Sequence, residues 1–342
     1  MKVRAISALA RLSLPILTRF DPELAHDLGL AALRRLRPWL RPPEIPAERA
    51  TRCFGLTFAH PVGLAAGFDK NGDCLDALGA LGFSHVELGT VTPRPQAGNP
   101  RPRMFRVAAS CALINRMGFN NKGVDHLVAQ ISRSNYRGVR GISIGKNADT
   151  PIGDAQNDYL ACLRKVYSHA DYIAVNVSSP NTARLRELQA PDGLERLLGI
   201  LLRERDVLQG LHGKRVPLLV KIAPDLQSEQ IVAMAQALRA LPVDGVIATN
   251  TSIDLRALGK DPAALQRGGL SGAPLHRQSI LVISQLRAQL GQSFPIIGVG
   301  GIVSADNALA TLRAGANLVQ IYTGFAYRGP LLLDEIQNAL SA

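Results

Sequence analysis

The chain has 342 residues, of which 46% are hydrophobic and 19% are charged, and its formal net charge is +12. This is the composition of an ordinary water-soluble chain, and no apolar run reaches the roughly 18 residues of a membrane-spanning helix. The 39 basic residues are spread along the chain without a Lys/Arg run, which argues against a nucleic-acid-binding protein despite the positive charge.

Two helices are predicted at the N-terminus. Residues 4–19 form an apolar-rich helix that Pro15 is expected to bend or shorten. The second helix has Asp21 as its expected N-cap and Pro22 in its first turn, and it ends at Pro38. Its apolar face consists of Leu24, Leu28, Ala31, Ala32 and Leu36.

This helix pair is basic. Residues 1–41 contain eight Lys or Arg and three Asp or Glu, which leaves a net charge of +5. The start of the chain loosely resembles a secretion signal, but Arg11 interrupts its apolar part and no cleavage site follows, so we expect no export. A Pro-rich linker, RPWLRPPEIP, ends near residue 46. We therefore predict an N-terminal helical domain with its linker, residues 1–45, and a second domain, residues 46–342.

After the linker, short apolar runs alternate with helical stretches, and each run ends in a polar or Gly-rich turn. Continuous apolar runs are typical of parallel strands buried on both faces. Eight such units predict a closed (β/α)8 barrel of the TIM type, with an open doubly wound sheet as the alternative. The dinucleotide fingerprint of that alternative is missing, because Val303 stands where G-x-G-x-x-G requires its last glycine. The runs lie at residues 61–66, 85–89, 141–145, 172–177, 216–222, 244–249, 294–299 and 318–323.

Polar side chains collect where these strands end and in the turns beside them, where a barrel of this kind carries its chemistry. Asn115, Asn176, Asn181 and Asn250 are expected to meet at one mouth of the barrel. Amides both donate and accept hydrogen bonds, so several together suit a flat ligand with amide-like edges, such as a pyrimidine. Lys221, inside the run LLVKI, would be a buried cation, which requires an anion or an electron-rich partner.

The glycines of GVGGI, LSG and YTG are placed to hold a phosphate, since such barrels commonly bind phosphate after strands seven and eight. Residues 141–145 match the G-x-S-x-G pattern of hydrolases, but Ser143 lies inside an apolar run and not on an exposed turn. The residues alone therefore indicate a barrel that binds a phosphorylated cofactor and a small planar substrate. A flavin-free barrel that binds a phosphorylated metabolite stays open as an alternative.

The spacing of the cysteine and histidine residues indicates whether the chain has a metal site or disulfide bonds. The four cysteines form no CxxC pair, and neither they nor the carboxylates cluster with histidine at a metal-like spacing. We therefore expect no metal site, no disulfide framework and a reducing, cytoplasmic compartment.

Eight motifs follow one another along the chain: AAGFDKNG, GTVTPRPQAGNPRPRMFR, NRMGFNN, NVSSPNT, LLVKIAPD, TNT, GGLSG and IIGVGGI. In content, order and spacing they resemble the class 2, membrane-associated dihydroorotate dehydrogenases of pyrimidine biosynthesis. The resemblance extends over almost the whole chain, including the N-terminal helix pair. It implies an FMN-binding (β/α)8 barrel with a small N-terminal helical domain, and we expect a monomer.

The resemblance also implies the reaction. Dihydroorotate is oxidised to orotate, with the proton on C5 going to a base and the hydride on C6 going to N5 of FMN. A quinone of the ubiquinone type then reoxidises the flavin. The class 2 base is a serine, which here is Ser179 of NVSSPNT, with a relay to water past Thr182 and Phe119. Soluble class 1 relatives use a cysteine instead and pass electrons to fumarate or a nicotinamide.

The resemblance assigns the remaining site residues by position. Those implied to bind substrate are Lys70, Asn115, Arg116, Met117, Gly118, Phe119, Asn176, Asn181, Asn250 and Thr251. Those implied to bind FMN are Ala66, Gly67, Phe68, Asp69, Lys70, Thr90, Ser143, Asn176, Lys221, Thr249, Gly272, Gly301, Tyr322 and Thr323. Lys221 would stabilise negative charge on the reduced flavin. The family usually has an asparagine where this chain has Ser143, and we expect FMN to be retained because many other contacts remain.

The helix pair acquires a role from the same resemblance. An amphipathic, net-positive helix pair can lie on an anionic membrane surface without spanning it. It would form a tunnel through which quinone reaches the flavin, with His26 and Arg106 on its wall. The enzyme would then be peripheral, on the cytoplasmic side of the cell (inner) membrane.

Overall fold

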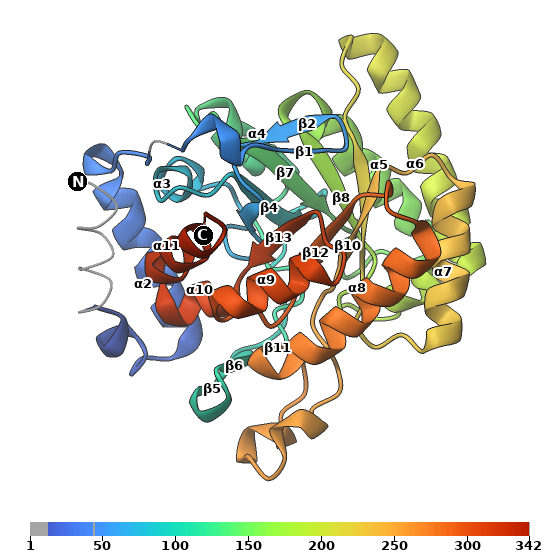
Figure 1. Cartoon of the computed structure of the whole chain (residues 1–342). Coiled ribbons are helices and arrows are strands. Elements are labelled where there is room, and N and C mark those ends of the chain that lie inside the picture. The colour runs from blue at the N-terminus through green and yellow to red at the C-terminus, as the bar shows by residue number, and fades with distance from the viewer. Residues whose placement is uncertain (1–12, 44, 342) are drawn as a thin grey trace.

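Eight parallel strands form a closed barrel in the computed structural model, which describes residues 13–43 and 45–341. Helices surround the barrel on its outside (Figure 1). Each strand pairs with the next one along the chain, and the last closes on the first. The strands are β3 (Val62–Leu64), β4 (His85–Val91), β7 (Val139–Ile144), β8 (Tyr172–Asn176), β9 (Leu218–Ile222), β10 (Gly245–Ala248), β12 (Ile296–Val299) and β13 (Leu318–Ile321). All eight predicted strands are confirmed, and the open doubly wound sheet is excluded.

The barrel strands are buried on both faces, as their continuous apolar sequences predict. In β4, Val86 and Leu88 belong to the large core between strands and helices, whereas Glu87 lies on the inner face between them. Inner residues such as Leu219 and Ile247 form a separate, smaller core inside the barrel. The outer helices are α3 (Leu75–Ala80), α4 (Val124–Ser132), α5 (Ala155–Val166), α6 (Pro191–His212), α7 (Ser228–Ala240), α8 (His276–Leu290), α9 (Ala305–Arg313), α10 (Thr323–Arg328) and α11 (Pro330–Ala339).

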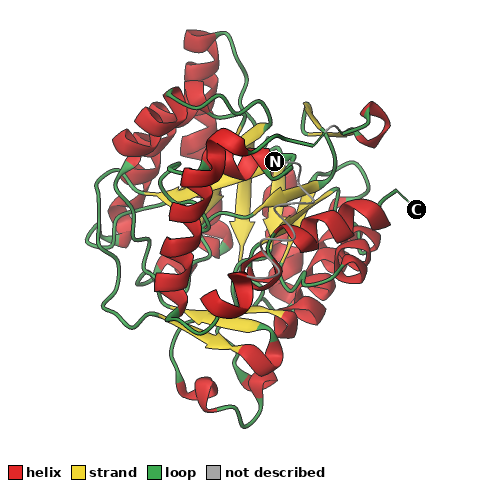
Figure 2. Cartoon of the chain, turned by 90° about the vertical axis from the view of Figure 1, so that its left-hand side faces the viewer, coloured by secondary structure: helices red, strands yellow, loops and turns green. Residues whose placement is uncertain are grey.

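Two small antiparallel sheets cap the barrel, and neither was predicted as strands. The hairpin of β1 (Thr51–Cys53) and β2 (Leu56–Phe58) packs Phe54 against Tyr172 and Phe58 against His85, at the amino ends of the strands. At the opposite end, β6 (Ala112–Asn115) pairs with both β5 (Met104–Val107) and β11 (Gly269–Gly272). This three-stranded sheet is seen below the barrel in Figure 2. Asn115 and LSG were expected in turns outside the strands, which is wrong, because they lie in β6 and β11, which pair although they are far apart in the sequence.

The second N-terminal helix is confirmed as α2 (Pro22–Leu36). Its N-cap is Asp21, whose carboxylate accepts hydrogen bonds from the backbone N–H groups of Glu23 and Leu24 at 3.0 Å. Residues 13–17 are helical, and the rest of the predicted helix at 4–19 lies outside the described residues. No helix in the described part of the chain is both long and apolar enough to cross a membrane.

The predicted apolar face of α2 packs against the core only in part, through Leu36. Leu24 and Leu28 are 47% and 43% exposed, and Leu28 lines an open groove between α2, residues 13–18 and the barrel. The contact with the core is made by Leu36 together with two positions outside the predicted face, Leu30 and Leu33. The linker is also held in place, since Leu40 is fully buried in the main core.

Candidate active site

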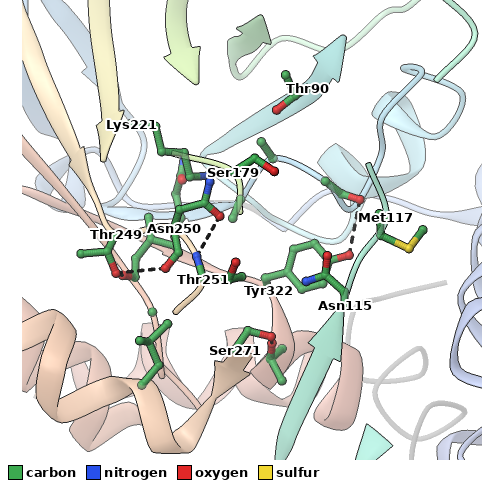
Figure 3. Close-up of a pocket in the computed structure, with 18 of the residues that line it drawn as sticks. Thr90, Asn115, Met117, Ser179, Lys221, Thr249, Asn250, Thr251, Ser271 and Tyr322 are labelled. Atoms are coloured by element: carbon green, nitrogen blue, oxygen red, sulfur yellow. Dashed lines mark hydrogen bonds between the residues drawn. The ribbon is translucent and has the colours of Figure 1, made fainter. Parts of the chain in front are cut away.

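A cavity opens at the carboxyl ends of the barrel strands, under the sheet that β6 and β11 form. The four asparagines predicted to meet there, Asn115, Asn176, Asn181 and Asn250, all line it. Asn181 Nδ2 donates to Asn115 Oδ1 at 3.2 Å, and Asn250 Nδ2 donates to Asn176 Oδ1 at 3.3 Å. Figure 3 shows Asn115 and Asn250 on facing sides of this cavity. The structure thus brings together four amides from three separate segments, the end of β6, the end of β8 with its loop, and the loop after β10.

Most other predicted site residues also line the cavity. The residues proposed for substrate or catalysis that do so are Lys70, Met117, Gly118, Phe119, Ser179 and Thr251. Those proposed for the cofactor are Ala66, Gly67, Thr90, Lys221, Thr249, Gly272, Gly301, Tyr322 and Thr323. Sequence reasoning did not single out Ser271, Leu275, Ile302 and Gln320, which line it as well.

Five residues predicted for substrate, catalysis or FMN do not line this cavity, namely Asp69, Arg116, Ser143, Phe68 and Thr182. The carboxylate of Asp69 is turned toward the start of α3, where it accepts hydrogen bonds from the N–H groups of Asp73 and Cys74. Burial raises the pKa of Asp69 to about 6. The guanidinium of Arg116 stacks over the ring of Phe105, 4.9 Å from its centroid. The side-chain charges of Asp69 and Arg116 are therefore used in contacts with the protein outside the cavity lining.

Ser143 is the third such residue. It is fully buried in β7, and its hydroxyl is hydrogen-bonded to that of Thr90 at 2.9 Å. Thr90 Oγ1 in turn accepts a hydrogen bond of 2.8 Å from Asn176 Nδ2. Ser143 therefore acts on the cavity only through Thr90 and Asn176, which both line it. Its place inside a strand is also inconsistent with an exposed hydrolase nucleophile.

Ser179 lies in the loop after β8, beside Pro180 and Asn181. Its side chain is buried, and its hydroxyl oxygen accepts a hydrogen bond from the backbone N–H of Asn181 at 3.3 Å. Thr182 is buried close by in the same loop, and its hydroxyl oxygen has no hydrogen-bond partner in the protein. A buried hydroxyl without a partner is unusual and suggests a place for water or ligand.

The floor of the cavity is a buried polar network that sequence reasoning found only in part. Lys221 Nζ lies 3.5 Å from Glu87 Oε1, and both side chains are almost fully buried. Glu87 Oε2 accepts hydrogen bonds of 2.9 Å from Tyr172 and from Gln320. Burial, and secondly the nearby Glu87, raise the pKa of Tyr172 far above its usual range, so its hydroxyl stays protonated as a donor. The predicted buried cation thus has an anion, Glu87, as its partner.

Lys70 is a second, partly buried cation, on another wall of the cavity. Its ammonium donates a hydrogen bond of 2.9 Å to the carbonyl of Gly67. Burial lowers the pKa of Lys70 to about 8, although Glu23 acts in the opposite direction. A lysine with so few protein partners favours an anionic group of a ligand.

One end of the cavity is built from glycines and hydroxyls. Gly301 has a φ of +73° and Gly272 a φ of +97°, a region that side chains with a Cβ rarely adopt. A Cβ on either residue would lie within 2.5 Å of neighbouring backbone atoms. Thr323 and Ser271 add hydroxyl groups, joined by a hydrogen bond of 2.8 Å. The glycines predicted to hold a phosphate thus lie at this end of the cavity, beside two hydroxyl groups.

The two residues predicted for a quinone site line the separate apolar groove beside α2. His26 and Arg106 are on its wall, together with Phe68 and Tyr322. The ring of His26 packs edge-on against Phe68 at 4.9 Å, and Phe68 packs against Tyr322 at 5.6 Å. Burial lowers the pKa of His26 to about 3, so its ring is neutral. Because Tyr322 lines both spaces, it forms part of the partition between groove and cavity.

The possible metal ligands and the cysteines of the described residues were compared with the sequence predictions. In that part of the chain, no group of three or more His, Cys, Asp or Glu is arranged to hold a metal ion. Its cysteines are free thiols.

Comparison with known proteins identifies the family. The family model described as dihydroorotate dehydrogenase matches residues 49–342. The chain belongs to the dihydroorotate dehydrogenase family. It is 55% identical to the dihydroorotate dehydrogenase (quinone) of Stenotrophomonas maltophilia R551-3, over 96% of this chain and 95% of that protein. Its identity to the enzyme of the same name from Alkalilimnicola ehrlichii is 52%, over 96% and 97%. These names are those of the class 2, quinone-linked members, which confirms the family predicted from the motifs.

Solved members of the dihydroorotate dehydrogenase family share the fold. The enzyme of Eimeria tenella, determined in complex with ferulenol, superposes with a TM-score of 0.87 at 37% identity, covering 94% of this chain and 90% of that one. The ligand-free form of the same enzyme gives the same TM-score and identity, with 94% of both chains covered.

Proposed function

We propose that this chain is a dihydroorotate dehydrogenase that oxidises (S)-dihydroorotate to orotate and passes the electrons to a quinone, in de novo pyrimidine biosynthesis. The observation that supports this most directly is the cavity in which four asparagine amides, the buried Lys221, the partly buried Lys70 and Ser179 face one another. This set matches a small, flat, anionic substrate with amide edges. A flavin-free barrel for a phosphorylated metabolite would have no use for a buried base beside these amides.

The cavity fits FMN as the resident cofactor. Gln320 is 1% exposed and lines the cavity, and its side-chain oxygen has no partner in the protein. With Lys221 beside it, this oxygen provides an acceptor next to a cation, which suits the polar edge of a flavin ring. The glycine-rich end at Gly272 and Gly301 would hold the phosphate. When bound, FMN accepts the hydride that leaves C6 of dihydroorotate and delivers electrons to the quinone.

The substrate would lie between the amides. Asn115, Asn181 and Asn250 can exchange hydrogen bonds with the ring N–H and carbonyl groups of dihydroorotate, because each amide offers both donors and an acceptor. Lys70 would pair with the substrate carboxylate, since it is a partly buried ammonium whose hydrogen bond within the described residues goes to a carbonyl. Thr251 completes this wall.

Ser179 would be the base that takes the proton from C5. A serine hydroxyl needs a route for this proton, and the unpaired hydroxyl of the nearby Thr182 is placed to hold water in that route. Phe119 lines the cavity and would keep other water out. Lys221 would stabilise the negative charge that develops when the hydride leaves.

The groove beside α2 would admit the quinone. Its wall is largely apolar, with Arg106 and the neutral ring of His26 as polar groups for a quinone carbonyl. Exposed apolar side chains at Ile16, Phe20 and Leu24 would enter the surface of the cell membrane from the cytoplasmic side. We propose a peripheral, monomeric enzyme whose helical domain, residues 1–45, faces the membrane.

A panel of electron acceptors tests this function against its nearest alternative, a soluble class 1-like enzyme. The purified enzyme with dihydroorotate is expected to reduce a short-chain ubiquinone and to be inactive with fumarate and with NAD. Turnover with fumarate or NAD but not with quinone would contradict the proposal.

A further inference from the structure

Two loops border the proposed base, and the barrel does not join them directly. The loop after β8, at residues 177–182, carries Ser179, and the loop after β10, at residues 249–253, carries Thr251. Strand β9 lies between β8 and β10 in the barrel. At the cavity, Asn250 Nδ2 joins the two loops by donating to Ser178 Oγ at 3.0 Å and to Asn176 Oδ1 at 3.3 Å. A second connection between the two loops lies outside the cavity lining.

Arg186 makes this connection. Its Nε donates to the carbonyl of Ser178 at 3.0 Å, and its Nη2 donates to the carbonyl of Thr251 at 2.8 Å. Its Nη1 donates to Asp225, in the loop after β9, at 2.7 Å. One guanidinium thus binds the loops after three successive strands, using a different nitrogen for each. The rigid, planar fork of arginine suits this, whereas a lysine ammonium has no fixed directions.

Asp225 extends the connection on the other side. One of its carboxylate oxygens accepts from the hydroxyl of Ser252, and the other accepts from the backbone N–H of Ile253 at 3.1 Å. The side chains of Arg186 and Asp225 are only 21% and 15% exposed. Such partly buried, charge-assisted contacts hold geometry more firmly than a pair on the surface.

We propose that Arg186 and Asp225 are positioning residues, which hold Ser179 and Thr251 at the separation that proton removal from the substrate requires. Neither residue lines the cavity, so both act through the loops they bind. The inference rests on the proposed function, because it assigns the effect to the half-reaction with dihydroorotate. The half-reaction with quinone takes place at the other side of Tyr322 and does not depend on these loops.

The chain offers a matched control two residues away. Arg184 also pairs with a carboxylate, that of Glu187, at 2.8 Å, but the two side chains are 67% and 53% exposed. It makes no contact with the loops around Ser179 among the hydrogen bonds of the described residues. Arg184→Lys and Arg186→Lys thus make the same chemical change at an exposed and at a connecting position.

The experiment measures both half-reactions by stopped flow in the FMN-loaded enzyme. Arg186→Lys is expected to slow flavin reduction by saturating dihydroorotate about 10- to 100-fold, the size of effect that slight misplacement of reacting groups produces. Reoxidation of the reduced flavin by a short-chain ubiquinone and the FMN content are expected to stay unchanged. Arg184→Lys is expected to match the wild type in both steps. Asp225→Asn, which is isosteric, is expected to behave as Arg186→Lys and replaces it if that variant does not fold.

Chemical rescue separates positioning from general damage. Arg186 and Asp225 also border a small pocket on the outer surface, from which added guanidinium can reach the vacated site. Arg186→Ala is expected to regain part of its flavin reduction rate in millimolar guanidinium, and Arg184→Ala is expected not to respond. Flavin reduction at the wild-type rate in Arg186→Lys, or equal slowing of both half-reactions, would overturn the proposal. A wild-type flavin that dihydroorotate does not reduce would instead refute the proposed function itself.

Discussion

Lys221 and Glu87 form an ion pair inside the barrel, with 3.5 Å between Lys221 Nζ and Glu87 Oε1. Replacing only one member of such a pair leaves an uncompensated buried charge, which costs about 3 kcal/mol. We therefore expect Glu87→Gln and Lys221→Met each to lower the free energy of unfolding by about 3 kcal/mol. The double variant should lose less free energy of unfolding than the sum of the two single losses. Urea unfolding of the apoenzyme followed by circular dichroism measures this, and strictly additive losses would show that the pair is not coupled.

Lys70 gives the enzyme a dependence on pH. Because its pKa is lowered to about 8, mainly by burial, the ammonium is charged below that pH and becomes neutral above it. Only the charged form attracts the carboxylate of orotate, so the dissociation constant of orotate should be flat below pH 8 and rise above it. The rise should approach tenfold per pH unit, because one proton is linked to binding.

Titration calorimetry between pH 7 and 9 tests this dependence. In Lys70→Met, orotate should bind about 10- to 100-fold more weakly, which corresponds to the loss of one charge-assisted hydrogen bond. Its binding should also be independent of pH over this range. If the wild type shows no rise between pH 8 and 9, Lys70 does not bind the carboxylate.

Ser179→Ala tests the proposed base. Removing the hydroxyl should slow flavin reduction by about 10²- to 10⁴-fold, the usual contribution of a positioned acid or base. Reoxidation by quinone should be unaffected and serves as the internal control. Rapid flavin reduction in Ser179→Ala would assign proton removal to another group.

Glu23 ties the N-terminal helices to the barrel. Its buried carboxylate in α2 accepts hydrogen bonds from Arg103 Nη2 at 2.7 Å and from Arg101 Nη2 at 2.8 Å. Glu23→Gln leaves the buried Arg103 without its anion and should lower the free energy of unfolding by about 3 kcal/mol. The exposed pair of Arg94 and Asp149 is the control, and Asp149→Asn should cost about 1 kcal/mol at most.

The lowered pKa of Glu23 predicts that the protein loses stability in acid. Burial acts to raise the pKa of Glu23, but the hydrogen bonds from Arg103 and Arg101 outweigh it and hold the pKa below 4.5. The unfolded chain therefore binds the proton more tightly than the folded one. The stability that Glu23 contributes is complete above pH 4.5 and is lost as the pH falls through the lower, folded value. Denaturation at a series of pH values should show this loss in the wild type and not in Glu23→Gln.

The barrel was predictable because its strands carry their own signal. Runs such as those of β8 and β9 are continuous and apolar, and such runs belong to parallel strands covered on both faces. The small sheets carry no such signal. Strands β1 and β2 have three residues each, and β11 begins with Gly269 and pairs with Asn115 far away in the sequence. Only the tertiary structure determines pairings of this kind.

Parts of the site could not be predicted from the sequence, because the tertiary structure determines those contacts as well. Glu87 in HVELG gave the same signal as Lys221 in LLVKI, a charge inside an apolar run, and pairing the two would have found the network. Arg184 and Arg186 cannot be told apart in ARLRELQ, since only the fold turns one toward solvent and the other toward the loop of Ser179. Likewise, the apolar face of α2 does not reveal whether core or groove will cover it.

The visible spectrum of the purified protein, recorded without oxygen before and after adding dihydroorotate, tests the central claim most directly. We expect a flavin absorption band that bleaches on adding dihydroorotate and returns on adding a ubiquinone. A band that dihydroorotate does not bleach would contradict the proposed substrate. The absence of a flavin band, even after incubation with FMN, would contradict the proposed function as a whole.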